Sequence, residues 1–410
     1  MTTAAMKDYT GERRGSERTT PFGFDPVLLA IIAIMLIFGL IMVFSATWDV
    51  SWRLTGDPNA LFRNQAKNLA IGLIPLIVAS LIPIRWLRKL AVPIMGATIL
   101  VLISVLILTA GEETRRALFQ GSIQPSEMAK LAIVIYLAVW MESKGDRLRS
   151  MDYGLLPLIG IIGIVAGLVL LQIDLSAFIT ICAVALGMFF LGGGRFWQFS
   201  ALSAGGAAFA FAIVRLTGKG WERWTEYMNG LTDVENAHYH VLQSLQALYS
   251  GGIFGVGLGA SRAKFGILPA PHTDSIFSII GEELGLLGAL VVILLFVLLL
   301  RRGFRVANGC EDRLGMLLAS GIVFWIMVEA LINMSVLVGL IPFAGNALPF
   351  FSYGGSSLVT TMAGCGLLLN VSRMSTATEE ARGSLASFGL SWRNRRRNIS
   401  RLGGRRRARS

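Results

Sequence analysis

The acidic residues that could do chemistry gather in one stretch, LPAPHTDSIFSIIGEELG, at residues 268–285. Asp274 stands at the start of a long apolar run, and Glu282 and Glu283 follow eight and nine residues later. On a helix that separation is about 12 Å, beyond the spacing of the carboxylate pair in a glycoside hydrolase. Asp274 is therefore predicted to act without a second acid, and the glutamates to pack against cationic or hydrogen-bonding partners. Capping of a helix by Thr273 or Asp274 is the alternative.

Basic residues that could hold an anion are spread over several segments. In QPSEMAKLA, Glu127 and Lys130 are three residues apart, so they share one helical face and can pair. Either they neutralise each other, or Lys130 lends its charge to an anionic ligand. The other cations could bind lipid phosphate or a phosphate-bearing substrate, and both readings stay open. The candidate substrate-binding cations are Arg63, Arg115, Arg116, Lys130, Arg223 and Lys264.

Composition places these residues in a membrane protein. The chain has 410 residues, of which 54% are hydrophobic and 15% charged, which does not fit a soluble globule. Its three cysteines have neither disulfide nor zinc-ligand spacing, so we expect no metal site in the protein itself. Eleven arginines lie from Arg373 onward. We expect this basic tail, residues 372–410, to be disordered against anionic lipid, and we expect no nucleic-acid partner.

The elements that must position the candidate residues are membrane helices, because ten apolar segments approach the length needed to cross about 30 Å of hydrocarbon. The predicted fold class is all-α, a polytopic bundle over residues 26–371 that follows a polar segment at 1–25 without the apolar core of a secretory signal. Lys and Arg gather in alternate connections, which predicts that both termini are cytoplasmic. The ten segments lie at about 26–46, 68–84, 91–110, 124–141, 154–171, 175–191, 197–214, 276–300, 314–340 and 347–371.

One long connection, residues 215–275, leads up to Asp274 and is predicted to be extracytoplasmic. Within it, HYHVLQSLQALYS has apolar residues at helical spacings, which predicts a short amphipathic helix. The string GGIFGVGLG lacks the Lys-Ser/Thr ending and the preceding strand of a phosphate loop, so we expect no nucleotide site. Elsewhere, Asp174 is predicted to cap the helix that follows it, and Glu329 and Asn333 to bond to other helices.

Taken in order, these motifs resemble the SEDS family of polytopic membrane proteins, the FtsW, RodA and SpoVE group. The most specific is PFFSYGGSSLVTTMAGCGLLLNVSR at 349–373, in which SYGGSS looks like the family signature. QPSEMAKLA, YHVLQSLQALYSGGIFGVGLG, HTDSIFSIIGEELGLLG and IPFAGNALPF support it. The residues that carry the motifs and are expected to have structural roles are Gln124, Pro125, Ser126, Glu127, His272, Thr273, Glu282, Glu283, Ser352, Tyr353, Gly354, Gly355, Ser356 and Ser357.

The resemblance implies a peptidoglycan glycosyltransferase that polymerises lipid II into glycan strands at the outer face of the plasma membrane, in division or elongation. In the family the Asp of the HTD motif is the proposed catalytic residue, which falls on Asp274, here the base that takes the proton of the acceptor hydroxyl in an inverting transfer. The family's basic residues are proposed to face the lipid pyrophosphate, which points to Arg116 and Lys130. Implied partners are lipid II, the growing strand, a class B penicillin-binding transpeptidase and other divisome or elongasome proteins. No cofactor is evident, although a divalent cation could arrive with the pyrophosphate.

Three departures from the family pattern concern the shape of the cleft. The family commonly reads LPEAHTDF where this chain has Ala270 and Ser275, and a Trp where it has Ala117. The usual Pro before Asp174 is Ile173. Two other functions stay open, a flippase for the same lipid-linked precursor and a noncatalytic scaffold of the cell-wall machinery. The sequence LPFFSYGGSS favours the FtsW and SpoVE side of the family over RodA.

Overall fold

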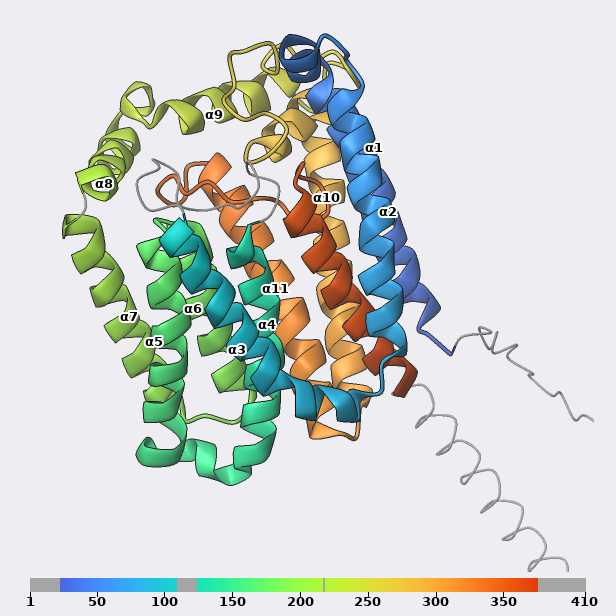
Figure 1. Ribbon diagram of the computed structural model, residues 1–410. Coiled ribbons are helices and arrows are strands. Elements are labelled where there is room, and N and C mark those ends of the chain that lie inside the picture. Colours follow the sequence, from blue (N-terminus) through green and yellow to red (C-terminus); the bar gives the residue numbers. More distant parts are fainter. Residues whose placement is uncertain (1–22, 109–123, 217, 375–410) are drawn as a thin grey trace, which may run out of the picture.

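The protein is a bundle of helices, described by a computed structural model over residues 23–108, 124–216 and 218–374 (Figure 1). Within this part of the chain the regular structure is helical and contains no strand, which confirms the predicted all-α class. A helix stands at each of the ten predicted spans. They are α1 Pro26–Thr55, α2 Ala60–Leu81, α3 Ile84–Leu108, α4 Pro125–Lys144, α5 Leu156–Leu171, α6 Leu175–Leu191, α7 Phe196–Leu216, α10 Ile276–Gly309, α11 Arg313–Leu337 and a last helix over 355–374.

Six apolar stretches are each long and hydrophobic enough to cross a membrane, which makes the chain a membrane protein. They belong to α1, α3, α5 with the π-turn Met151–Leu155 before it, α7, α10 and α11. The shorter or more polar helices pack among them, and α4 contacts α3, α6 and α11. α11 is the most buried of the six spans and α7 the least, so the core surrounds α11 while α7 lies at the rim.

The last two predicted spans have different bounds in the structure. α11 ends at Leu337, and the helix expected from 347 begins only at 355. The intervening residues, 338–354, form a non-helical connection in which Phe350 adopts a left-handed φ of 71°. Pro349 lies between Leu348 and Phe350. A proline disfavours helical geometry in the residue before it, which here is Leu348. The apolar composition of residues 347–354 therefore predicted a helix where the connection continues.

α10 is a broken helix, and the break explains the glycine string that precedes it. Gly285 has φ 71° and ψ −167°, outside the helical region. The freed backbone is satisfied by the string, because Leu286 N donates to Gly252 O at 2.9 Å and Val256 N to Glu282 O at 3.0 Å. A Cβ on Gly255 would lie 2.2 Å from Glu283 O, so the close approach requires glycine.

The described part of the long connection 215–275 contains two α-helices and, between them, a 3-10 turn at Val234–Asn236. The predicted amphipathic helix is present as α9, Tyr239–Gly251. The other, α8 at Gly218–Thr232, was not predicted, although Trp221, Trp224 and Met228 have helical spacing. Figure 1 shows α8 and α9 lying across one end of the bundle, which we term the α8–α9 end.

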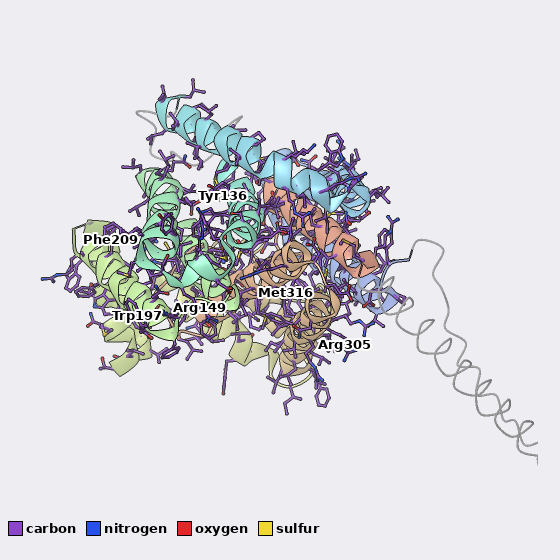
Figure 2. The ribbon with its side chains drawn as sticks, turned by 90° about the horizontal axis from the view of Figure 1, so that it is seen from below. Tyr136, Arg149, Trp197, Phe209, Arg305 and Met316 are labelled. Atoms are coloured by element: carbon purple, nitrogen blue, oxygen red, sulfur yellow. The ribbon has the colours of Figure 1, made fainter. Side chains whose placement is uncertain are left out.

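The first and last described residues meet at the opposite end. Asp25 caps α1, its N–H donates to Ser372 Oγ at 3.2 Å, and its carboxylate accepts from Arg302 Nε at 2.6 Å. Figure 2 views the bundle from this end, where Arg149 and Arg305 are labelled. The meeting of the two chain ends at one end of the bundle agrees with the predicted even number of membrane crossings. Which side of the membrane they occupy stays a prediction.

Candidate functional site

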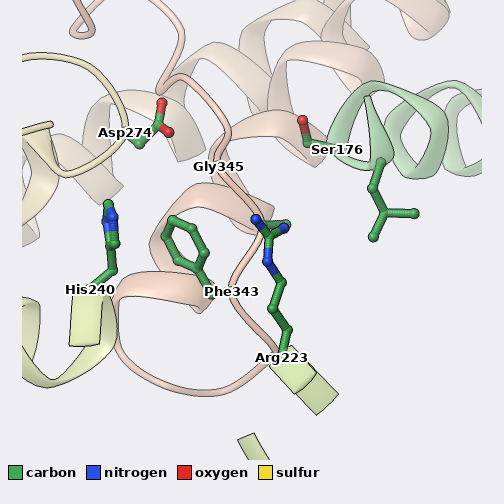
Figure 3. A pocket seen from close by; sticks show the side chains of 8 residues that line it. Ser176, Arg223, His240, Asp274, Phe343 and Gly345 are labelled. Atoms are coloured by element: carbon green, nitrogen blue, oxygen red, sulfur yellow. The ribbon is translucent and has the colours of Figure 1, made fainter. Parts of the chain in front are cut away.

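A cavity at the α8–α9 end brings Asp274 together with residues from distant segments (Figure 3). Its volume is about 180 Å³. In Figure 3, His240, Phe343 and Arg223 stand in a row, with Asp274 and Ser176 beyond them. The lining comes from α6, α8, α9, the loop before α10 and the connection 338–354, and consists of Leu175, Ser176, Arg223, His240, Asp274, Phe343, Ala344 and Gly345.

Asp274 lies in a tight turn directly before α10. The carbonyl of Ala270, which has a positive φ of 46°, accepts hydrogen bonds from Thr273 N at 3.2 Å and Ser275 N at 3.3 Å. Ser275 is the N-cap of α10, and its own side chain makes no capping hydrogen bond. The cap position is thus one residue later than the alternative of a Thr273 or Asp274 cap expected, and a capping role for the Asp274 side chain stays a prediction.

The SYGGSS signature holds this turn from the other side. Tyr353 N donates to His272 O at 2.7 Å, and Ser352 Oγ donates to Thr273 O at 2.6 Å across 79 residues of sequence. The rings of His272 and Tyr353 meet edge to face at 5.5 Å. Burial lowers the pKa of His272, so its imidazole is neutral at pH 7. The two residues before Asp274 are thus bound through backbone carbonyls.

The same signature also reaches α2 and the start of α4. Gln65 Nε2 donates to Ser352 O at 3.3 Å, and its Oε1 accepts from Gly354 N at 3.3 Å. The backbone N–H of Gln124 donates to Ser356 Oγ at 3.4 Å. A Cβ on Gly355 would lie 3.1 Å from the Asn68 side chain of α2. SYGGSS therefore joins α2 and the start of α4 to the Asp274 turn.

Asn333 of α11 supports Asp274 from inside the bundle. Its Nδ2 donates to Asp274 O at 2.8 Å and to Asn346 O at 2.5 Å. Asn346 in turn donates to Glu329 O at 3.1 Å. Asn333 thus bonds to non-helical backbone, whereas the sequence predicted another helix as its partner. Gly345 completes the contact, because a Cβ there would lie 2.5 Å from Asp274 Oδ2.

Lys130 lies in the bundle interior and is not among the residues that line the cavity. Its ammonium donates to Glu127 Oε1 at 2.7 Å and also pairs with Glu329 of α11, and the side chain is 2% exposed. The predicted Glu127–Lys130 pair and the bond from Glu329 to another helix are confirmed. Two carboxylates around one ammonium stabilise the charged lysine in a dry interior.

Lys264 and the two glutamates form a second buried cluster. Lys264 Nζ donates to Glu283 Oε1 at 3.0 Å, and Glu283 also accepts from Ser45 Oγ of α1 at 2.7 Å. Glu282 accepts from Arg262 N at 2.9 Å. The expected cationic and hydrogen-bonding partners are confirmed. Glu282 is thereby bonded to the loop before α10, and Glu283 is bonded both to Lys264 of that loop and to α1.

Of the six candidate cations, the described structure places Arg223 in the cavity with Asp274. Arg63 is exposed and pairs with Asp57, whose pKa is held below its usual value by the N–H of Asn59 and by Arg63 itself. Arg115 and Arg116 lie outside the described residues. The substrate-binding roles of the cations stay predictions.

Asp174 is the predicted N-cap of α6 and accepts from Ala177 N at 3.2 Å, which confirms that expectation. Its other oxygen accepts from Gln124 Nε2 at 2.9 Å and Ser126 Oγ at 2.8 Å. The QPSE motif is therefore bonded to the start of α6, next to the cavity-lining Ser176. Within the described residues no group of three His, Cys, Asp or Glu could hold a metal ion. The divalent cation expected with the substrate stays a prediction.

Of the lining residues, the sequence singled out Arg223 and Asp274, and it missed Ser176, His240, Phe343 and Gly345 among the others. The imidazole of His240 lies 4.3 Å from the Phe343 ring, centroid to centroid, and the imidazole of His238 stacks on the same ring at 4.5 Å. Arg223 lies over that ring at 5.5 Å. The amphipathic pattern of α9 was visible in the sequence, but what its first turn faces was not, because the connection 338–354 is about 100 residues away.

Comparison with known proteins finds one family over nearly the whole bundle. Residues 26–377 match the family of FtsW, RodA and SpoVE proteins, described as "Cell cycle protein". Stage V sporulation protein E of Bacillus subtilis is 36% identical over 365 residues, covering 88% of this chain and 99% of that protein. A probable peptidoglycan glycosyltransferase FtsW of Trichlorobacter lovleyi is 35% identical over 356 residues, covering 85% of this chain and 93% of that protein.

Solved structures show the same arrangement of helices. The rod shape determining protein RodA of Thermus thermophilus superposes with a TM-score of 0.62 at 28% identity, covering 85% of this chain and 97% of that one. A chain from a peptidoglycan synthase complex, studied for its coordination of polymerization and crosslinking, gives a TM-score of 0.68 at 28% identity and covers 86% of this chain and 98% of that one.

Proposed function

This chain belongs to the FtsW, RodA and SpoVE family of peptidoglycan glycosyltransferases, as its motifs predicted, and we propose that it polymerises lipid II into glycan strands at the outer face of the plasma membrane. The observation that carries the proposal is the cavity in which the Asp274 carboxylate and the Arg223 guanidinium both stand. It lies at the end of the bundle that the charge pattern assigns to the outside.

Asp274 is the general base of the proposed reaction. The acceptor sugar hydroxyl attacks the anomeric carbon of the donor, Asp274 takes the hydroxyl proton, and the bond to the lipid pyrophosphate breaks with inversion. The leaving group departs already charged, so it needs cations and no acid. Among the described lining residues Asp274 supplies the carboxylate, and the partners of Glu282 and Glu283 leave them no part in this step.

The departing pyrophosphate is proposed to meet arginines. Arg223 lines the cavity, and Arg115 and Arg116 shortly precede Gln124, whose backbone bonds to Ser356 in the signature. Lys130, Lys264 and Arg63 are paired with carboxylates. None of those three lines the cavity, so we assign the larger share of the pyrophosphate contact to Arg223, Arg115 and Arg116. A divalent cation, if the substrate brought one, would offset the charge of the pyrophosphate together with these arginines.

The proposed partners follow from the same family. We infer that the chain works with a class B penicillin-binding transpeptidase and with other divisome or elongasome membrane proteins. Support comes from the structural likeness to a chain of a peptidoglycan synthase complex. The FtsW and SpoVE relatives favour a role in division or sporulation.

The test is lipid II polymerisation by the purified chain with its transpeptidase partner. Asp274→Asn should lower the rate at least about 100-fold, because general-base catalysis contributes about 10² to 10⁴. The variant should keep its melting temperature and its partner, since the backbone bonds of the turn are unchanged. Asp152→Asn, an exposed acid near the opposite end, is the matched control.

Three outcomes would change the proposal. Full polymerisation by Asp274→Asn would remove Asp274 as the base. Transfer of lipid II between leaflets by the wild-type protein, with no polymer formed, would replace the polymerase with a flippase. If the wild-type protein shows neither activity in the presence of the partner, the function that remains is a noncatalytic scaffold.

A further inference from the structure

His240 is a further polar residue of the cavity lining, and it faces Asp274 across the cavity (Figure 3). It stands in the first turn of α9, where its backbone N–H donates to Nδ1 of the N-cap His238 at 3.2 Å. Its ring packs on Phe343 at 4.3 Å with a tilt of 34°. The imidazole is therefore oriented by an aromatic contact and by the helix start, and no side-chain hydrogen bond ties it down within the described structure.

The charge state of His240 suits a place beside a catalytic carboxylate. Burial, the neighbouring His238 and Arg223 lower the pKa of His240 to about 4, so the ring is neutral at pH 7. A protonated imidazole would form an ion pair with Asp274 and weaken it as a base. A neutral one leaves the carboxylate its basicity and still offers one hydrogen-bond donor and one acceptor.

Stability does not explain an imidazole at this position. His240 Nδ1 is buried and has no hydrogen-bond partner among the described residues. Burying an unpaired polar atom opposes folding, and an apolar side chain of similar size would pack on Phe343 without that cost. Because Nδ1 is enclosed, Nε2 is the nitrogen left to meet a ligand in the cavity.

We propose that His240 is a substrate-binding residue whose Nε2 forms a hydrogen bond with the acceptor saccharide and turns its attacking hydroxyl toward Asp274. The inference rests on the proposed function and deepens it. It assigns the side of the cavity formed by α9 and the connection 338–354 to the acceptor sugar. The aromatic ring of Phe343 would lie beneath the imidazole as its support.

Three substitutions separate the two ring nitrogens. The amide of His240→Gln reaches the position of Nε2, the amide of His240→Asn reaches only that of Nδ1, and His240→Leu has no polar group. We expect lipid II polymerisation, measured as kcat/KM with the transpeptidase partner, to fall about tenfold in the Asn and Leu variants, the worth of one hydrogen bond. The Gln variant should stay within about threefold of wild type, with a melting temperature equal to that of the other two.

Gln246→Asn is the control, because it shortens an exposed amide side chain on the same helix, α9, and Gln246 does not line the cavity. Its activity should match that of the wild type. Equal activity in the Asn, Gln and wild-type proteins would overturn the inference, and so would losses that follow melting temperature alone. The Gln and Asn comparison is sufficient if the Leu variant does not fold.

Lipid II binding by the detergent-solubilised protein, measured without turnover, keeps this inference separate from the proposed function. Tighter binding by the Gln variant than by the Asn variant supports the His240 contact even if the wild type forms no polymer. Equal binding by the two variants overturns the contact even if the wild type polymerises normally.

Discussion

At the scale of single residues, the position of Asp274, the candidate base, depends on the absence of a side chain at Gly345 as well as on hydrogen bonds. Asn333 and Ser352 hold the backbone on either side of the Asp274 turn, and Gly345 leaves room for the carboxylate itself. A base must reach its proton at about 2.6–3.2 Å, so small displacements matter. The geometry makes Gly345 a positioning residue for Asp274.

Replacing Gly345 with Ala would test this placement. The new Cβ would lie 2.5 Å from Asp274 Oδ2, so the carboxylate must turn away. We expect polymerisation to fall about 10- to 100-fold, because a misplacement of about 1 Å can cost that much. The melting temperature should change little, since the carboxylate can move into the cavity. Gly218→Ala is the control, because the methyl group that it adds meets no other atom within 4 Å, and wild-type activity in Gly345→Ala would contradict the role.

At the scale of elements, the site depends on how closely α9 approaches the broken helix α10. The glycine string, residues 251–259, bonds to the α10 backbone at the break. Because α9 leads directly into this string, the contact fixes the position of α9 and therefore of His240. At the end of α9, a Cβ on Gly251 would lie 2.0 Å from the backbone oxygen of Gly281. Backbone cannot move aside as a flexible side chain can, so this contact requires glycine.

Gly251→Ala should therefore destabilise the protein by about 1–3 kcal/mol, the usual cost of overpacking, because α9 and α10 must separate. Thermal unfolding in detergent measures the effect. Gly160→Ala in α5 is the matched control, since nothing lies within 4 Å of its new methyl group and alanine favours helix by up to about 1 kcal/mol. Equal melting temperatures for the two variants would show that the approach of α9 to α10 is not tight.

At the scale of the whole molecule, the candidate site and the two ends of the described chain lie at opposite ends of the bundle. Asp25 and Ser372 meet at one end, and α8, α9 and the cavity lie at the other (Figure 1). A site for a lipid-linked sugar at the outer surface requires the first of these ends to be cytoplasmic. The arginines on connections at that end favour the same orientation.

Reporter fusions check the orientation. Green fluorescent protein fused after Met374 should fluoresce, because it folds in the cytoplasm, and alkaline phosphatase inserted after Asp233 should be active, because it needs the oxidising outer side. An inactive phosphatase at Asp233 together with an active one after Met374 would reverse the orientation. The candidate site would then face the cytoplasm and could not build the wall outside.

Much of the fold followed from local patterns. Hydropathy located ten helices, three-residue spacing paired Glu127 with Lys130, and an Asp before an apolar run identified the cap at Asp174. Helical rise separated Asp274 from Glu282 and Glu283, and the structure gives both glutamates other partners. Each of these inferences depends on residues within about three turns of one another, a range over which helix geometry is known in advance.

Only the tertiary structure decided what surrounds Asp274. It supplied Glu329 as the second partner of Lys130, the break at Gly285, and the meeting of His240 with Phe343. It also showed that the last helix begins at 355, eight residues later than predicted. Apolar composition does not distinguish a buried connection from a helix, and contacts across a hundred residues depend on packing of the whole bundle. The sequence by itself therefore located the helices of the ten spans and made Asp274 the candidate acid, whereas the cavity around Asp274 depends on packing of the whole bundle.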